Sequence, residues 1–321
     1  MKHLGIALLV SMSVVACSSD DTGLSVSSFE DSQISSGEWS ASRSIVLDGR
    51  GDEADVYYPA PPASVRDEFE DRFPIAVVLQ GGRVDKAHYS NFGAALARMG
   101  FVVVVPNHMQ AFPPGSEPWL LTDQFVLLDV LSHMERVDSD PSSEFYKIVD
   151  TQRVGLVGHS VGGAVGLYTA QGTCDPPFCM GAFERPASLR AGVFFGTNSY
   201  GPDGSFIDFE TSALPVALIH GSLDNSAEVR ETYDSLDGTR ALITLDGVNH
   251  FGITNENNPS GPTPDPAEPT MEQHEATELT ALWVGVALRT WVMGDEDARF
   301  WLYESGGSPS ELVSTTAEDR P

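Results

Sequence analysis

Basic residues are scarce in this chain of 321 residues, which has 18 Lys and Arg against 46 Asp and Glu. Only three of the basic residues are lysines, and the formal net charge at pH 7 is -28. Proteins bind nucleic acids largely by neutralising phosphate groups with Lys and Arg, so this charge would repel a nucleic acid. We therefore expect no nucleic-acid partner. The acidic residues form no long block of like charge, which is typical of a solvated acidic surface.

Hydrophobic runs long enough to cross a membrane are also missing. The N-terminal apolar stretch, Leu4 to Ala16, follows the basic residue Lys2. A membrane-spanning helix needs about 20 apolar residues, whereas a shorter stretch after a positive start is typical of a secretory signal peptide. We therefore assign residues 1–16 to a signal peptide.

The end of this signal, residues 14–17 (VVAC), resembles the lipobox of bacterial lipoproteins. The resemblance implies cleavage before Cys17 and acylation of that cysteine, so that the protein is exported and lipid-anchored to the bacterial cell envelope, at the outer membrane or the cell surface. An ordinary signal peptide with an incidental cysteine is the alternative. Residues 17–37 are Ser-rich and polar, which predicts a flexible tether between the anchor and the folded domain.

Cysteine is rare, with three in the whole chain. With Cys17 assigned to the lipid, Cys174 and Cys179 remain as a closely spaced pair. In an exported protein such a pair is expected to form a local disulfide. Two thiolates without a nearby histidine cannot complete a tetrahedral metal site, so we expect no metal there.

Residues 38–304 show the pattern of one α/β domain. Apolar runs rich in Val and Ile are typical of parallel strands buried on both faces. Such runs lie at residues 75–79, 101–105, 154–157, 191–195, 216–220 and 241–245. Helical patterns alternate with them at residues 91–99, 120–135, 161–171, 227–236 and 270–293. This alternation predicts a mostly parallel, doubly wound sheet with a ligand site at the carboxyl ends of its strands.

The ends of the domain carry different signals. Residues 39–47 and 54–58 alternate apolar and polar side chains around the turn at 48–51 (DGRG), which predicts an N-terminal antiparallel hairpin. Residues 305–321 are polar and lack periodicity, so we expect a disordered tail.

A candidate nucleophile lies in residues 158–162 (GHSVG), directly after one apolar run and directly before a helical pattern. A Gly-x-Ser-x-Gly sequence in this context places the serine on a sharp strand-to-helix turn, because the two glycines let strand and helix approach closely. A Gly-rich turn without chemistry is the alternative. The strand-turn-helix context favours Ser160 as a nucleophile.

A serine nucleophile needs a histidine base and an acid that orients the base, in the chain order Ser, acid, His. His250 follows the last apolar run in a Gly-flanked loop, whereas His220 ends a run and His274 opens a helical pattern, so His250 is our base. Asp224 follows the preceding run and is our acid. Asp203 and Asp208, which follow an earlier run, are its rivals.

The oxyanion hole is expected to combine two backbone amides, one from the residue after the nucleophile and one from the loop after the third strand. These positions predict Val161 and Gly82 as donors. Because a backbone donor leaves no side-chain signature, the pair Gly81-Gly82 could also be a simple turn, and Arg83 is then the fallback.

Four segments of the chain carry a family resemblance: residues 158–163 (GHSVGG), 220–227 (HGSLDNSA), 245–251 (LDGVNHF) and 101–106 (FVVVVP). They are similar to the α/β-hydrolase branch that holds bacterial cutinase-like polyester hydrolases, chlorophyllases and platelet-activating-factor acetylhydrolases. The resemblance implies the α/β-hydrolase fold and a serine esterase without cofactor, with Ser160, Asp224 and His250 as triad. The chain departs from the polyesterases at residues 80–82, at Val161 in place of methionine, and in having no tryptophan at residues 194–198.

We therefore expect a monomeric carboxylic ester hydrolase that acts on a small-molecule or polymeric ester. A polyester hydrolase, an acyltransferase with the same triad, and a non-catalytic binding lipoprotein on a hydrolase fold are the alternatives. Residues 112–119 and 172–188 are candidate walls of the substrate pocket.

Overall fold

A computed structural model describes residues 40–60, 72–174, 176–201, 204–224, 226–305 and 311–320. The predicted signal peptide, the tether and Cys17 lie outside these residues. In the part of the chain that is described, no helix is both long and apolar enough to cross a membrane.

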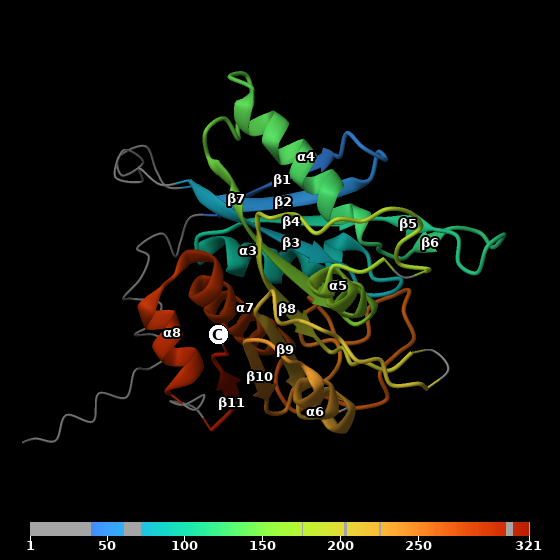
Figure 1. The fold of residues 1–321 in the computed structure, drawn as a ribbon, viewed down its shortest axis with the longest axis vertical. Helices are drawn as coiled ribbons and strands as arrows, with labels where there is room; N and C mark the ends of the chain where they lie inside the picture. Colours follow the sequence, from blue (N-terminus) through green and yellow to red (C-terminus); the bar gives the residue numbers. More distant parts are fainter. Residues whose placement is uncertain are drawn as a thin grey trace, which may run out of the picture.

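Within the described residues, one mostly parallel sheet of nine strands forms the centre of the fold, in the order β1-β2-β4-β3-β7-β8-β9-β10-β11 (Figure 1). Its strands are β1 (Ser40–Val46), β2 (Glu53–Pro59), β3 (Phe73–Leu79), β4 (Val102–Asn107), β7 (Val149–His159), β8 (Leu189–Phe195), β9 (Val216–Gly221), β10 (Arg240–Leu245) and β11 (Val313–Glu318). Every neighbouring pair from β4 to β10 is parallel. The prediction of an α/β domain with a mostly parallel sheet is confirmed.

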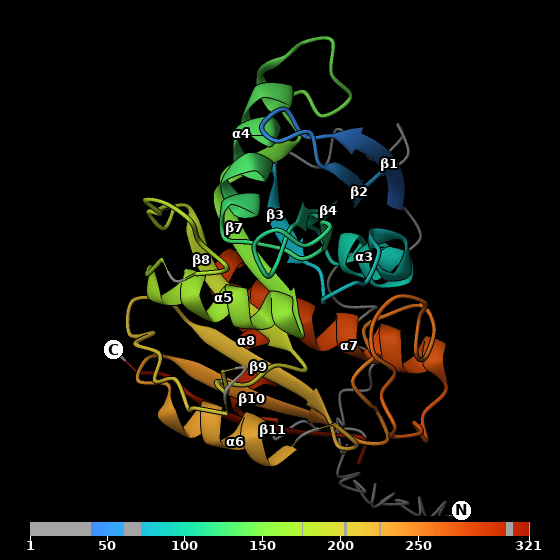
Figure 2. The same cartoon turned by 90° about the vertical axis from the view of Figure 1, so that its right-hand side faces the viewer.

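Helices cover both faces of this sheet, as Figures 1 and 2 show together. On one face lie α3 (Ser90–Arg98), α7 (Gln273–Leu288) and α8 (Glu296–Tyr303), and on the other α4 (Phe125–Ser139), α5 (Val161–Gln171) and α6 (Ser226–Ser235). Alternate residues of one strand enter different cores: Ala76 and Val78 face α3 and α7, whereas Ile75 and Val77 face α4 and α5. Burial on both faces explains why these strands are continuously apolar.

The N-terminal hairpin is confirmed, since β1 and β2 pair in antiparallel register. The predicted helix at 270–293 is α7 followed by a π-helical turn, η2 (Arg289–Met293). The helix predicted from residue 120 begins five residues later, because β6 (Trp119–Leu120) pairs with β5 (Met109–Gln110) in a small hairpin that extends away from the sheet in Figure 1.

The prediction of a disordered tail over residues 305–321 is wrong for part of that segment. Val313–Glu318 form β11, which pairs with β10 in antiparallel register at the edge of the sheet. Val313 is buried and enters the core beneath α7 and α8. The polar residues that follow it alternate across an edge strand whose outer side faces solvent, so the sequence shows little of the hydrophobic pattern that marks the central strands.

Candidate active site

Ser160 occupies a strained turn between the end of β7 and the start of α5. Its backbone angles are φ 54° and ψ -119°, a region that residues other than glycine rarely adopt. A Cβ atom at Gly158 would lie 2.4 Å from the carbonyl oxygen of Gly162, and one at Gly162 would lie 2.2 Å from the carbonyl oxygen of Leu79. Only glycine fits these two contacts, so the motif builds the close strand-helix approach that the sequence predicts.

The loops after β9 and β10 bring Asp224 and His250 together. The amide of Leu223 donates to the carbonyl of Val248 at 3.0 Å, which joins the two loops. Asp224 Oδ2 then lies 3.0 Å from His250 Nδ1. Because Nδ1 faces the carboxylate, the proton of the neutral ring is held there and Nε2 is the atom able to accept a proton.

Within the described residues, the competing assignments do not take the places of Asp224 and His250. Asp208 is exposed and forms no hydrogen bond to His250 among the described residues, and Asp203 lies outside them. His220 is buried, and its Nε2 lies 2.9 Å from the Thr244 hydroxyl. His274 is exposed near the start of α7.

A pocket of about 220 Å³ opens over Ser160 and His250. Its lining residues are Gly82, Val84, His159, Ser160, Val161, His250, Phe251, Pro262 and Thr263. The predicted nucleophile, base and oxyanion donors therefore share one pocket at the carboxyl ends of the strands. This lining contains no residue of 112–119 or of the described part of 172–188, although the Trp119 ring would lie 3.5 Å from a Cβ atom at Gly82, beside the pocket. Pro262 and Thr263, from the Pro-rich loop before α7, line the pocket instead.

The predicted oxyanion donors lie next to each other beside the nucleophile. A Cβ atom at Gly82 would meet the Val161 side chain at 3.6 Å. Val161 is the first residue of α5, so its amide has no acceptor within the helix. The side chain of Arg83 instead stacks on Trp119, with its guanidinium carbon 4.7 Å from the ring centroid. The backbone amide of Arg83 already donates to the Leu120 carbonyl at 2.8 Å, which favours Gly82 over Arg83 as the second donor.

The pKa of His250 is set by competing effects. Burial acts to lower it, but the hydrogen bond that Nδ1 donates to Asp224 and the negative charges of Asp224 and Asp265 outweigh burial and raise the pKa above 6.5. Asp265 is a residue that the sequence did not single out. Its Oδ2 accepts the backbone amide of His250 at 2.9 Å, and its Oδ1 accepts the amide of Ala267 at 2.8 Å. It thereby fastens the Pro-rich loop to the base.

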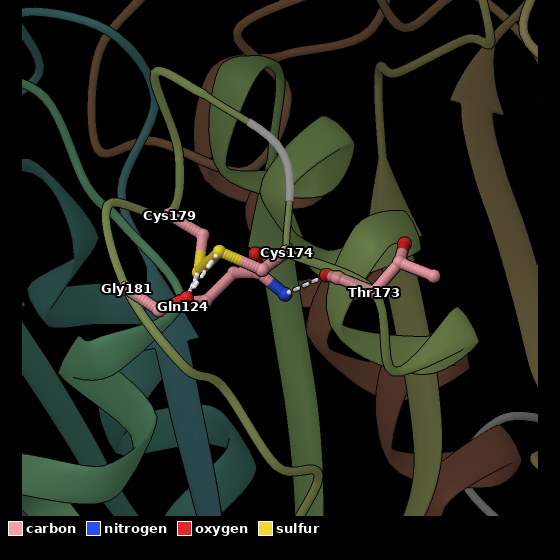
Figure 3. The surroundings of a disulfide bond; sticks show 5 residues. All are labelled: Gln124, Thr173, Cys174, Cys179 and Gly181. Carbon is pink, nitrogen blue, oxygen red and sulfur yellow. Dashed lines mark hydrogen bonds between the residues drawn. A yellow bond between two sulfur atoms is a disulfide. The ribbon is translucent and has the colours of Figure 1, made fainter.

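The predicted disulfide between Cys174 and Cys179 is confirmed, with their Cα atoms 5.1 Å apart (Figure 3). Gln124, at the start of α4, holds this segment in place, since its side-chain amide donates to the Thr173 carbonyl at 2.9 Å (Figure 3). Its backbone amide donates to the Phe178 carbonyl at 2.9 Å. The disulfide therefore belongs to a loop anchored on α4 and outside the pocket lining.

No group of three or more His, Cys, Asp and Glu side chains able to hold a metal ion is found within the described residues. The chain matches no protein-family model, and no curated protein sequence matches it.

Proposed function

We propose that this protein is a serine hydrolase of the α/β-hydrolase fold that cleaves carboxylic esters through an acyl-enzyme on Ser160. The arrangement of three side chains carries the proposal. Ser160, at a strained strand-helix turn, shares a pocket with His250, and Nδ1 of that histidine lies 3.0 Å from Asp224. The chain order of the three residues and the mostly parallel sheet support the fold assignment.

The chemistry follows from the proposed roles. His250 Nε2 takes the proton of the Ser160 hydroxyl as its oxygen attacks the ester carbonyl. The oxyanion that forms accepts hydrogen bonds from the amides of Gly82 and Val161. Collapse expels the alcohol, which takes the proton from His250. Water then repeats the sequence on the acyl-enzyme and releases the carboxylic acid.

The pocket indicates the size of the acyl group. Its volume of about 220 Å³ is below the roughly 300 to 1,000 Å³ of pockets that enclose drug-sized ligands. Several of its walls are apolar: Val84, Val161, Phe251 and Pro262. Short to medium acyl chains fit these walls better than long ones.

An ester panel compared between the wild type and Ser160→Ala tests the proposal. We expect p-nitrophenyl butyrate and hexanoate to be cleaved faster than the palmitate, by the wild type alone and in the presence of EDTA. Equal rates for the two proteins, faster cleavage of peptides than of esters, or loss of activity in EDTA would contradict the proposal.

We also propose export and lipid anchoring at Cys17, which rest on the sequence of residues 1–37. Metabolic labelling with palmitate in a bacterial host should mark the wild type and leave Cys17→Ala unmarked. Labelling of both proteins would show that the lipid is attached elsewhere.

A further inference from the structure

A chain of three hydrogen bonds passes through His159, which lines the pocket. The amide of Gly81 lies 2.8 Å from the hydroxyl of Tyr89, which ends the short helix η1 (Lys86–Tyr89). The same hydroxyl lies 2.9 Å from Nδ1 of His159, and Nε2 of His159 lies 3.0 Å from the backbone carbonyl of His250. The side chains of Tyr89 and His159 are inaccessible to solvent.

The chemistry of these groups allows one direction of donation. A backbone amide only donates, so the Tyr89 oxygen accepts from Gly81 and its own proton goes to Nδ1 of His159. A carbonyl only accepts, so His159 carries its proton on Nε2 and donates it to His250. Burial and the neighbouring His250 lower the pKa of His159 to about 3, and burial raises the pKa of Tyr89, so both stay neutral at ordinary pH.

The chain of hydrogen bonds joins three segments whose relative positions the proposed reaction depends on. Gly81 precedes the proposed oxyanion donor Gly82, His159 precedes Ser160, and the last acceptor is the backbone of the proposed base. These segments lie at the carboxyl ends of β3, β7 and β10, which are far apart in the sequence. On the other side of His250, Asp265 accepts its amide. The backbone of His250 is therefore held at both its carbonyl and its amide.

We propose that Tyr89 and His159 are positioning residues that fix the oxyanion donor Gly82 and the base His250 relative to Ser160. This inference rests on the proposed function, because it assigns the two residues a role in that reaction. Tyr89 sets the oxyanion side through Gly81, and His159 sets the base side through the His250 carbonyl. Neither residue exchanges a proton with the substrate.

Tyr89→Phe removes one hydroxyl and leaves the Gly81 amide without its acceptor. Oxyanion contacts act in the transition state, and a displacement of about 1 Å can cost roughly 100-fold in rate. We expect kcat for p-nitrophenyl butyrate to fall about 10- to 100-fold while KM changes less than twofold. Tyr233→Phe is the matched control, because the buried Tyr233 hydroxyl has no hydrogen-bond partner among the described residues. It should leave both constants unchanged.

Two substitutions of His159 separate its two hydrogen bonds. Asn reaches about as far as ring Nδ1 and can accept from Tyr89, whereas Gln reaches toward Nε2 and can donate to the His250 carbonyl. Tyr89→Phe cuts the links of its hydroxyl to Gly81 and to His159, and His159→Gln cuts only the second of these. The double variant should therefore lose no more activity than Tyr89→Phe alone. His159→Asn instead cuts the link to the His250 carbonyl, so its loss should multiply with that of Tyr89→Phe.

His159→Asn should also move the acid limb of the pH profile. It removes the hydrogen bond that holds the His250 backbone, and so changes the position of the His250 ring relative to Asp224 and Asp265, the charges that raise its pKa. His159→Gln should leave that limb in place. The melting temperature of each variant shows whether it folds. Equal kcat losses for Tyr89→Phe and Tyr233→Phe, or independent losses for Tyr89→Phe and His159→Gln, would overturn the proposal.

A measurement without catalysis keeps the inference separable from the proposed function. In ¹⁵N-histidine-labelled Ser160→Ala protein, we expect His159 to show the Nε2-protonated neutral tautomer from pH 5 to 8 and no titration. A Nδ1-protonated ring, or titration near 6.5, would overturn it. If Ser160 takes part in no reaction, the ester panel fails while this spectrum still reports on the hydrogen-bond chain.

Discussion

Replacing Asp224 with Asn changes the charge beside His250 and little of its shape. The carboxylate lies 3.0 Å from Nδ1 and its side chain is 13% exposed, so solvent offers a weak substitute for it. If the new amide group donates to Nδ1, the ring proton moves to Nε2, and the base can no longer accept the proton of Ser160.

Two magnitudes follow. In serine protease triads the same change costs about 10⁴-fold in kcat, or about 5 kcal/mol of transition-state stabilisation, and we expect a loss of that order. The hydrogen bond and charge of Asp224 are the main causes that raise the pKa of His250, and only the charge of Asp265 would remain against burial. The residual activity should therefore persist to lower pH than wild-type activity, because the base stays neutral there.

The assay is kcat/KM for p-nitrophenyl butyrate from pH 5 to 9. Asp208→Asn is the matched control, since it makes the same chemical change at an exposed carboxylate that is not among the groups acting on the pKa of His250. A loss of less than 10-fold in Asp224→Asn, an equal loss in Asp208→Asn, or an acid limb that moves to higher pH would refute the assignment of the acid.

Three further perturbations test the site and the stability of the fold. Asp265→Asn should shift the acid limb of the pH profile to lower pH, because it removes one charge that raises the pKa of His250. It should lower kcat less than 10-fold, because the new side chain keeps an oxygen that accepts the His250 amide. A shift of the acid limb to higher pH would contradict this. Burial opposes ionisation of Asp123, but its hydrogen bonds to His108 and Arg50 lower its pKa from 3.8 to about 2. Its charge therefore stabilises the fold above pH 4, and this stabilisation is lost as the pH falls toward 2, so Asp123→Asn should cost about 2 kcal/mol of unfolding free energy at pH 7 and progressively less in acid. Chemical denaturation at pH 7 and pH 3 checks this, and a cost that grows in acid would count against it. Added sodium chloride should raise the melting temperature, because it screens the self-repulsion of a chain with net charge -28; calorimetry that shows a steady fall with salt would refute this.

Much of the fold could be predicted because the central strands carry an unambiguous signal. The strand Val102–Asn107 is buried on both faces, so its run of valines marks it as parallel and internal. β11 could not be predicted, because an edge strand needs only one buried face and Val313 is its only fully buried residue. Pairing with β10, which depends on distant sequence, decides its structure.

The candidate site, like the fold, could be predicted only in part. Ser160, Asp224 and His250 could be brought together from sequence, because residues that follow neighbouring parallel strands meet at one edge of the sheet. Asp265 could not, because it lies in a Pro-rich loop without periodicity and its contact with the His250 amide depends on the path of that loop. Tyr89 could not be predicted either, because no motif marks this tyrosine in the sequence. Its contacts with Gly81 and His159 depend on the folding of distant segments.

The central claim is that Ser160 forms a covalent acyl-enzyme, and a phosphonate ester probe with mass spectrometry tests it most directly. The account predicts one equivalent of label on Ser160 in the wild type, far slower labelling in Asp224→Asn and His250→Ala, and none in Ser160→Ala. Label that persists in Ser160→Ala, or a wild type that takes up none, would contradict it.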